Sequence, residues 1–296
     1  MSDEVIVCYE RWDMERLREV KAMPNLIKEL KQLLDAQTIV LEKDGRLRVH
    51  YSTKRGDAHG RMYANLSVRV NDAWISGGLS LAPMKRWVRR YLCQDLYHDF
   101  DIVNCAPVLL QQIMERHNLC PPELVRYIER RDAIFAPYLK KGIARSVVKQ
   151  AFLEVLHNGQ GTEWMPETME LRTAIQSGLK KLARMREYAL AAHDAETGKA
   201  NFMGRFCAHI WQVQEQRLLM TMRQYFIQLG YSRYHMVLCF DGLMLEKRGV
   251  GECAPINLSF LSDYLHRETG FRVRVEEKAL DFDSEDTDDF NKASGL

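Results

Sequence analysis

Two apolar, strand-like segments that each close on an aspartate constrain this chain more than any other feature. The first is Tyr97-His-Asp-Phe-Asp-Ile-Val-Asn104, and the second is Met236-Val-Leu-Cys-Phe-Asp-Gly242. A carboxylate at the end of a buried strand is costly unless a cation lies beside it. A long stretch of helical periodicity separates the two segments. The sequence therefore predicts an α+β fold, in which helices back a small antiparallel sheet and a helical insertion separates the two acidic strands.

The apolar periodicity also predicts the other elements. Residues 11–36 are typical of an amphipathic helix, and residues 38–51 are typical of a hairpin that turns at Asp44-Gly45. The pattern predicts further helices at 104–117, 122–131, 138–157, 167–193, 201–229 and 256–268, and further strands at 234–240, 243–247 and 271–276.

The composition is that of an ordinary globular chain. With 296 residues, of which 46% are apolar and 28% are charged, the chain can bury a sizeable core. No apolar run is long enough to cross a membrane, and the acidic N-terminal segment does not resemble a secretory signal. The seven cysteines form no CxxC pair, so they do not support a zinc site and favour reduced thiols in a cytosol.

The charge is distributed unevenly. Residues 276–296 carry eight acids and two lysines, a balance of −6, which leaves +8 for the rest of a chain whose total is +2. A basic body suits contact with phosphate backbones. The segment 281–296 is typical of a disordered, solvating tail. The sequence leaves open whether this tail also screens a basic groove.

A cationic stripe lies between the two acidic segments. Arg145 and Lys149 are four residues apart, hence neighbours on one helix face, and Leu153 and His157 continue the stripe at the same step. Two cations suit a triphosphate, and an apolar residue with a ring suits a base. Asn158-Gly159 then ends the helix. The alternative interpretation is a solvated surface face, the usual place for a basic pair of this spacing.

Both acidic segments also have a plain structural interpretation. Asp99 and Asp101 share a strand face, where Mg²⁺ could bind, but Asp101 could equally cap the following helix. Asp241-Gly242 between two apolar strands is typical of a two-residue hairpin turn. The same turn would bring Asp241 to the sheet edge, where it and Asp101 could hold two metal ions about 3.5–4 Å apart for phosphoryl displacement.

Taken in this order, the segments resemble the palm and fingers of family A DNA polymerases and the related single-subunit phage-type RNA polymerases. In that family a strand ends in a metal-binding aspartate, and a fingers helix carries Arg-x3-Lys-x3-apolar-x3-Tyr-Gly. A hairpin holds the second metal-binding aspartate. Asp101, the stripe from Arg145 to His157, and Asp241 match these three motifs. The resemblance covers roughly residues 50–250.

A further match lies upstream of the first acidic segment. The family has a Gly-Arg segment, then a Leu-Gln-x-x-Pro stretch and a basic run. This chain has Gly60-Arg61, then Leu79-Ser-Leu-Ala-Pro83, and then the basic residues Lys85, Arg86, Arg89 and Arg90. The resemblance implies that Arg61 contacts the primer–template and that the arginines of the basic run grip the duplex backbone.

The resemblance also implies a division of the chain. Residues 1–52 would be an N-terminal helix and hairpin, and 53–135 would contact the template and primer and carry the first palm motif. Residues 136–200 would form the fingers, 201–280 the palm with the second metal-binding aspartate, and 281–296 the acidic tail.

The chain departs from the family in the residues around its motifs. His157 replaces the tyrosine of the fingers helix, and Asn158 is inserted before the glycine. Phe240 and Gly242 replace the residues that flank the second aspartate.

The residue five positions after the first metal-binding aspartate bears on the choice of sugar. DNA polymerases of the family carry a glutamate there that crowds a ribose 2′-hydroxyl, and the RNA-making relatives carry a small residue. Counted from Asp101 this position is Ala106, which favours acceptance of ribonucleotides, and Asn104 falls where the family has a glutamine. If Asp99 were the ligand instead, the position would be Asn104.

The resemblance implies a template-dependent nucleotidyltransferase. Asp101 and Asp241 would hold two Mg²⁺ ions, for which Mn²⁺ would substitute, and Lys149 would supply a proton to the leaving pyrophosphate. The residues that would contact the incoming nucleotide are Arg145, Lys149, Leu153, His157, Asn104 and Ala106.

The expected partners are a DNA template and primer, dNTPs or NTPs, and a replicative helicase or other replication proteins, with no membrane. A phage or viral origin is expected, with the bacterial host's cytoplasm as the location for a phage protein. Three alternatives to a DNA polymerase stay open: a primase or single-subunit RNA polymerase, a metal-dependent nuclease, and a non-catalytic nucleic-acid-binding subunit.

Overall fold

The computed structural model describes residues 5–53, 61–65, 67–70, 73–76, 80–196, 201–247, 254–282 and 284–295. The chain forms two compact units. The first joins Met1–Val103 with Gln216–Leu296, and the second is Asn104–Glu215. The predicted fingers segment 136–200 lies within the second unit. None of the described helices is long and apolar enough to cross a membrane.

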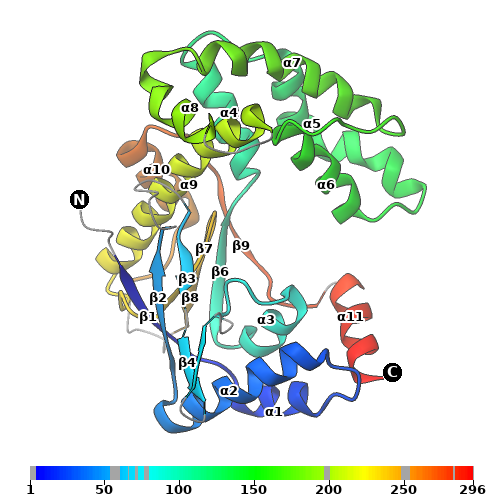
Figure 1. Ribbon diagram of the computed structural model, residues 1–296. Helices are drawn as coiled ribbons and strands as arrows, with labels where there is room; N and C mark the ends of the chain where they lie inside the picture. Colours follow the sequence, from blue (N-terminus) through cyan, green and yellow to red (C-terminus); the bar gives the residue numbers. More distant parts are fainter. Residues whose placement is uncertain are drawn as a thin grey trace. The chain divides into compact units, whose positions relative to one another are not determined.

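A four-stranded antiparallel sheet organises the first unit (Figure 1). Its strands are β6 (Tyr97–Ile102), β7 (Met236–Cys239), β8 (Gly242–Glu246) and β9 (Val275–Lys278), in the order β7-β8-β6-β9. α10 (Leu258–Thr269) connects β8 to β9. The predicted strands at 234–240 and 243–247 and the predicted helix at 256–268 coincide closely with β7, β8 and α10.

The two faces of this sheet differ in chemistry. Successive side chains of a strand point to opposite faces, so Phe100 of β6 lies on one face while Asp99 and Asp101 lie on the other. On the apolar face the ring of Phe100 stacks on Phe226 of α9 (Phe202–Gln228), with centroids 4.9 Å apart. The predicted α+β class, with a small antiparallel sheet backed by helices, is confirmed.

Two smaller ladders belong to the N-terminal part of the first unit. β1 (Ile6–Glu10) pairs antiparallel with β2 (Leu47–Ser52), which also pairs with β3 (Tyr63–Asn65). β4 (Ser67–Val70) and β5 (Ala73–Ser76) form a separate two-stranded ladder. The sequence pattern did not predict β1, although its apolar run is typical of a strand.

The single helix predicted over 11–36 is divided in the structure. α1 (Met14–Ala22) begins after Asp13, whose side chain accepts hydrogen bonds from the N–H groups of Glu15 and Arg16. The helix ends just before Pro24, which has no N–H to donate to a helical ladder. A second helix then begins at Lys28.

The predicted hairpin over 38–51 is wrong in its first half. The backbone there continues as α2 (Lys28–Asp44), and Thr38 and Leu41 are buried at helical spacing. Packing of this face outweighs the β-branched composition, which alone favours a strand. Gly45, with φ of 67°, ends the helix by donating its N–H to the Leu41 carbonyl at 2.7 Å.

A buried carboxyl group joins β1 to the loop before α3 (Arg86–Cys93). Glu10 is fully buried and accepts hydrogen bonds from the hydroxyls of Tyr51 and Ser80 and from the N–H of Leu81, each at 2.8 Å. Burial raises the pKa of Glu10, because the charged form loses its water. These hydrogen bonds fix the segment that leads into α3.

The second unit is helical. Its elements are α4 (Cys105–Glu115), α5 (Pro122–Lys140), α6 (Arg145–Leu156), α7 (Pro166–Leu182), the short 3-10 helix η1 (Arg186–Tyr188), α8 (Ala189–Glu196) and the first part of α9. The helix predicted at 104–117 is present as α4. The helix predicted over 167–193 is divided into α7, η1 and α8.

The boundary predicted between helices 122–131 and 138–157 is wrong. α5 has a non-helical residue at Arg130, yet it continues past Pro137 to Lys140. The chain then turns at Gly142, whose φ of 78° favours glycine, before α6 begins.

The C-terminal acidic segment is a helix, so the prediction of a disordered tail is wrong. α11 (Ser284–Ser294) carries four acids of this segment, and its Phe290 packs against Trp87 and Tyr91 of α3, with centroids 6.0 and 5.3 Å apart. Asp286 of the same helix is 2% exposed. Aromatic burial and a buried charge partner order a segment whose composition alone predicts solvation.

Glu10→Gln is predicted to remove part of the pH dependence of stability. Burial raises the pKa of Glu10 above its ordinary value of 4.5, so the folded chain keeps a proton that the unfolded chain releases. The free energy of unfolding should therefore fall as the pH rises through 4.5 toward the raised pKa, and the variant should lose this slope. Urea unfolding at several pH values measures it. The exposed Glu15→Gln is the control, and equal slopes in wild type and Glu10→Gln would contradict the account.

Candidate functional site

Asp101 and Asp241 lie at the same end of the four-stranded sheet. Asp101 of β6 is paired with Gly242 of β8, and the N–H of Ile102 donates to the carbonyl of Asp241 at 3.1 Å. The backbones of the two predicted metal ligands are therefore adjacent, although 140 positions of sequence separate them.

Gly242 leaves room for the carboxylate of Asp101. A Cβ atom at this position would stand 2.6 Å from the carbonyl oxygen of Phe100 and 3.1 Å from Oδ1 of Asp101. The first distance is a clash with backbone, which can move only if the β6–β8 pairing changes. The glycine next to Asp241 therefore has a structural reason, since it keeps the space beside Asp101 open.

A strained two-residue turn presents Asp241. The β7–β8 pairing resumes at Gly242, so the turn residues are Phe240 and Asp241, and the expected turn at Asp241-Gly242 is wrong by one position. Phe240 has φ of 55°, which costs a bulky residue about 1–2 kcal/mol. The guanidinium of Arg61 lies 4.7 Å from the centre of the Phe240 ring, and Tyr63 meets that ring edge-on at 5.6 Å. These contacts hold the turn in its strained form.

Gly60 and Leu79, which belong to the upstream match, lie outside the described residues.

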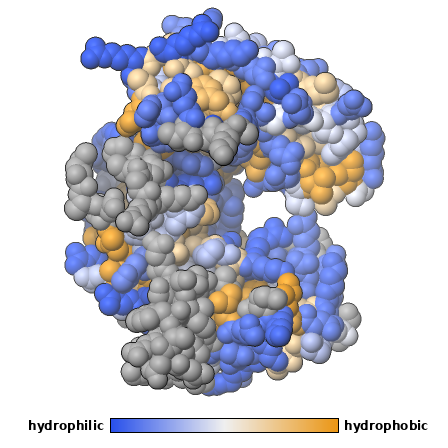
Figure 2. Space-filling view, viewed as in Figure 1, coloured by the Kyte–Doolittle hydropathy of each residue, from blue (hydrophilic) through white to orange (hydrophobic). Residues whose placement is uncertain are grey.

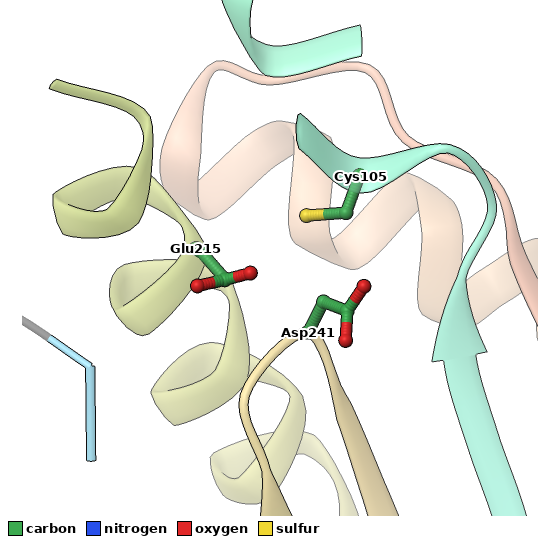
Figure 3. Close-up of side chains that lie close together, drawn as sticks. All are labelled: Cys105, Glu215 and Asp241. Carbon is green, nitrogen blue, oxygen red and sulfur yellow. The ribbon is translucent and has the colours of Figure 1, made fainter. Parts of the chain in front are cut away.

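The carboxylate of Asp241 lies close to the side chains of Cys105 and Glu215 (Figure 3). Their ligand atoms lie within 4.8 Å of one another, with Cys105 at the start of α4 and Glu215 on α9. The two carboxylates supply the oxygen ligands that Mg²⁺ prefers, whereas a thiolate suits softer ions. Glu215 is 1% exposed, and a carboxylate buried to this degree needs a cation or hydrogen-bond donors close by.

Glu215 is a candidate site residue that the sequence motifs missed. The sequence does carry a signal for it: Glu215 falls four residues after Trp211 and four before Leu219, and both are buried. An acid on the apolar stripe of a helix is costly to bury, so its presence there indicates a role.

Asp99 lies two residue pairs further from the β7–β8 turn than Asp101. It is paired with Met244 of β8 on one side and with Lys278 of β9 on the other. Burial raises the pKa of Asp99, while the positive charges of Arg89 and Lys278 act to lower it. Asp101 is thus the carboxylate next to the turn, and Asp99 is set back from it.

Asn104 and Ala106, three and five positions after Asp101, lie at the start of α4. Asn104, at φ of 53°, takes the capping position of this helix, so Asp101 is not its cap. Ala106 is in the first turn and is half-buried.

The predicted cationic stripe is on α6 in the second unit. Arg145 and Lys149 are exposed, although Val148 and Phe152, which neighbour them at helical spacing on α6, are buried. Arg145 has a partner that the sequence did not predict. Its guanidinium donates a hydrogen bond to Asp132 of α5 and lowers the pKa of that carboxyl group. The side chains of this pair are 49% and 83% exposed, so the pair contributes little stability and a stronger anion can displace it.

The apolar end of the stripe is partly covered. Leu153 and His157 are half-buried, and the ring of His157 meets Trp211 edge-on at 5.6 Å. Asn158, at φ of 60°, takes the left-handed position that ends α6, so the helix end predicted at Asn158-Gly159 is confirmed. Its side chain accepts a hydrogen bond from Gln176 at 3.1 Å, which ties α6 to α7.

The predicted phosphate contacts of α3 have partners within the protein. Arg86 pairs with Asp286 at 3.0 Å and with Glu285 at 3.2 Å, and Arg90 pairs with the other oxygen of Asp286. Arg89 donates to a backbone carbonyl of the preceding loop at 3.0 Å. Figure 2 shows mostly hydrophilic side chains over α11. The acidic helix therefore covers part of the basic one, and a nucleic acid would have to compete with it.

Comparisons with known proteins give weak likenesses. No family model matches the chain. V13 of Sputnik virophage, whose name describes it as a proposed helicase, is 22% identical over 250 residues. The match covers 80% of this chain and 30% of that protein, so the chain spans less than a third of its relative.

Among solved structures, the POL domain of Pol1 from M. smegmatis, in complex with DNA primer-template and dNTP, is similar at a TM-score of 0.45. The identity is 12%, and the match covers 85% of this chain and 51% of that one. A likeness at this level does not carry the site or the activity from that protein to this chain.

Gly242→Ala is predicted to destabilise the chain by about 1–3 kcal/mol, because the added methyl group would push against the backbone of β6. Met244→Leu, a volume-conserving change two residues along β8, is the control and should cost less than about 1.5 kcal/mol. Chemical denaturation measures both. A loss for Gly242→Ala no larger than that of the control would contradict the close approach at this position.

Asp286→Asn is predicted to cost about 1.5–3 kcal/mol, because a buried charged acceptor of Arg86 and Arg90 is lost. The control is Asp288→Asn, an exposed change on the same helix, which should stay within about 0.5 kcal/mol. Thermal and urea unfolding measure both variants. Equal effects would mean that these ion pairs do not hold α11.

Proposed function

We propose that this chain is a template-dependent nucleotidyltransferase, a DNA polymerase of the family A type that uses two-metal-ion phosphoryl transfer. The observation that carries the proposal is the pairing of β6 with β8. It brings the backbones of Asp101 and Asp241 next to each other at one end of an antiparallel sheet. Two aspartates so arranged are the minimum protein equipment for holding metal ions during transfer of a nucleotide.

Asp101 and Asp241 would hold the Mg²⁺ ions, with Mn²⁺ as a substitute. Two observations support the fit: the space that Gly242 leaves beside Oδ1 of Asp101, and the second carboxylate, Glu215, near Asp241. Asp101 is preferred to Asp99 because it is paired with the residue that follows Asp241. When bound, the ions would supply Lewis-acid activation and neutralise charge on the phosphates.

Arg145 and Lys149 would bind the incoming triphosphate. Their exposure on α6 supports this role, as does the weakness of the ion pair between Arg145 and Asp132. Lys149 would also donate a proton to the leaving pyrophosphate, and Leu153 and His157 would pack against the base or sugar. The work of these side chains is to position the nucleotide for in-line attack by a 3′-hydroxyl.

Arg61 and the arginines of α3 would contact the primer–template. The position of Arg61 on the ring of Phe240, beside Asp241, supports a contact near the metal-binding end of the sheet. Arg89 donates to a backbone carbonyl of the loop before α3, whereas Arg86 and Arg90 would exchange Asp286 for phosphate. Binding through such contacts should weaken steeply with salt.

The virophage relative is named as a helicase, which supports a helicase as a partner of this chain rather than helicase activity in it. This chain has no Gly-x4-Gly-Lys-Ser/Thr phosphate loop, the motif that a P-loop helicase uses to bind its nucleotide. Helicase activity is therefore not part of the proposal. A replicative helicase, on the same or another chain, is proposed as a partner.

A primase or single-subunit RNA polymerase is the second candidate, and Ala106 favours it. This side chain is a methyl group in the first turn of α4, five positions after Asp101. A small residue there would remove the barrier that a glutamate raises against a ribose 2′-hydroxyl. Acceptance of both sugars would be the consequence.

Primer extension on a single-stranded DNA template tests the proposal. With Mg²⁺ and dNTPs the chain should extend a primer, and Asp101→Asn and Asp241→Asn should each slow extension about a hundredfold or more. Asp95→Asn, an exposed change in the loop before β6, is the control. Replacing dNTPs by NTPs, with and without a primer, separates the two candidates.

Two outcomes would contradict the proposal. Degradation of the DNA without triphosphates, abolished by Asp241→Asn, would indicate a metal-dependent nuclease. Binding of DNA with no synthesis under any nucleotide set would indicate a non-catalytic subunit.

A further inference from the structure

A lysine of β9 holds the carboxylate of Asp101. The ammonium group of Lys278 donates to Oδ2 of Asp101 and forms an ion pair with it. In the antiparallel register Lys278 is opposite Asp99, and Glu276 is opposite Asp101. Directly opposed residues share a sheet face, so one ammonium group stands among three carboxylates on the face that carries Asp101.

The two oxygens of Asp101 are engaged differently. Oδ2 accepts from Lys278, whereas Oδ1 faces the space that Gly242 leaves open. The side chain of Asp101 is 18% exposed and that of Lys278 is 40% exposed. Partial burial strengthens the attraction between them relative to bulk water. The carboxylate of Asp101 therefore already has a counter-charge supplied by the protein.

We propose that Lys278 is a resident counter-cation that competes with divalent metal ions for Asp101 and so sets how tightly the chain holds them. The inference rests on the proposed metal-binding role of Asp101. A divalent ion that binds this carboxylate meets a positive charge on its other oxygen, and the repulsion lowers the affinity. Firm metal binding would then need the oxygens of a triphosphate as additional ligands.

A lysine that only stabilised the pairing of β6 with β9 would behave differently. Its neutral replacement would lower the stability of the sheet and leave metal affinity unchanged or weaker. A competing counter-cation predicts the opposite sign, since its removal frees the carboxylate and removes the repulsion. The direction of the change in metal affinity therefore distinguishes the two roles.

The test is a titration of the full chain with Mn²⁺ alone, without nucleotide. Calorimetry and water-proton relaxation measure the dissociation constant of Mn²⁺. Lys278→Gln should lower the dissociation constant about threefold to tenfold. Lys278→Arg, which keeps the charge, should stay within about twofold of wild type. Lys292→Gln is the matched control: it removes the same charge from an exposed lysine of α11 and should leave the constant unchanged. Circular dichroism and urea unfolding verify that each variant is folded.

Asp101→Asn separates failure of the inference from failure of the proposed function. If Asp101→Asn weakens Mn²⁺ binding but Lys278→Gln leaves it unchanged or weaker, the inference is overturned and the metal role of Asp101 stands. If Asp101→Asn binds Mn²⁺ as the wild type does, both are overturned. The inference also predicts that Lys278→Gln gives no gain in an Asp101→Asn background, because the two residues act on one ligand.

Discussion

The antiparallel pairing of β6 with β8 is the interaction on which the candidate site depends. It places Asp101 opposite Gly242, whose missing side chain leaves the carboxylate room. The register is held from the other face of the sheet, where Phe100 stacks on Phe226. A slip by one residue would turn Asp101 into this core and Phe100 out of it. The geometry of the acidic face is thus a consequence of packing on the apolar face.

The sequence predicted best the elements whose pattern is local. α4, α9, β7 and β8 follow from apolar periodicity alone. The errors arose where tertiary contacts override composition. Residues 38–43 are rich in β-branched side chains but belong to α2, because Leu41 is buried on its face. The acidic tail folds as α11 because Phe290 packs against two aromatic rings of α3.

The candidate site could be predicted only in part, for the same reason. Asp101 and Asp241 could be singled out because each closes an apolar strand, whereas their adjacency depends on strand pairing that no local pattern encodes. Glu215 of α9 and Lys278 of β9 belong to elements that are distant in the sequence from both aspartates. Only Glu215 could be noticed in the sequence, because it is an acid on the apolar stripe of a helix. Partners in exposed ion pairs, such as Asp132 for Arg145, leave no pattern at all.

The most direct test of the central claim is anomalous diffraction from crystals of the chain soaked with Mn²⁺ and a nucleoside triphosphate analogue that cannot react. The account predicts anomalous density about 2 Å from carboxylate oxygens of both Asp101 and Asp241, since these are the proposed ligands. Ordered Mn²⁺ bound to the nucleotide but away from both carboxylates would contradict it.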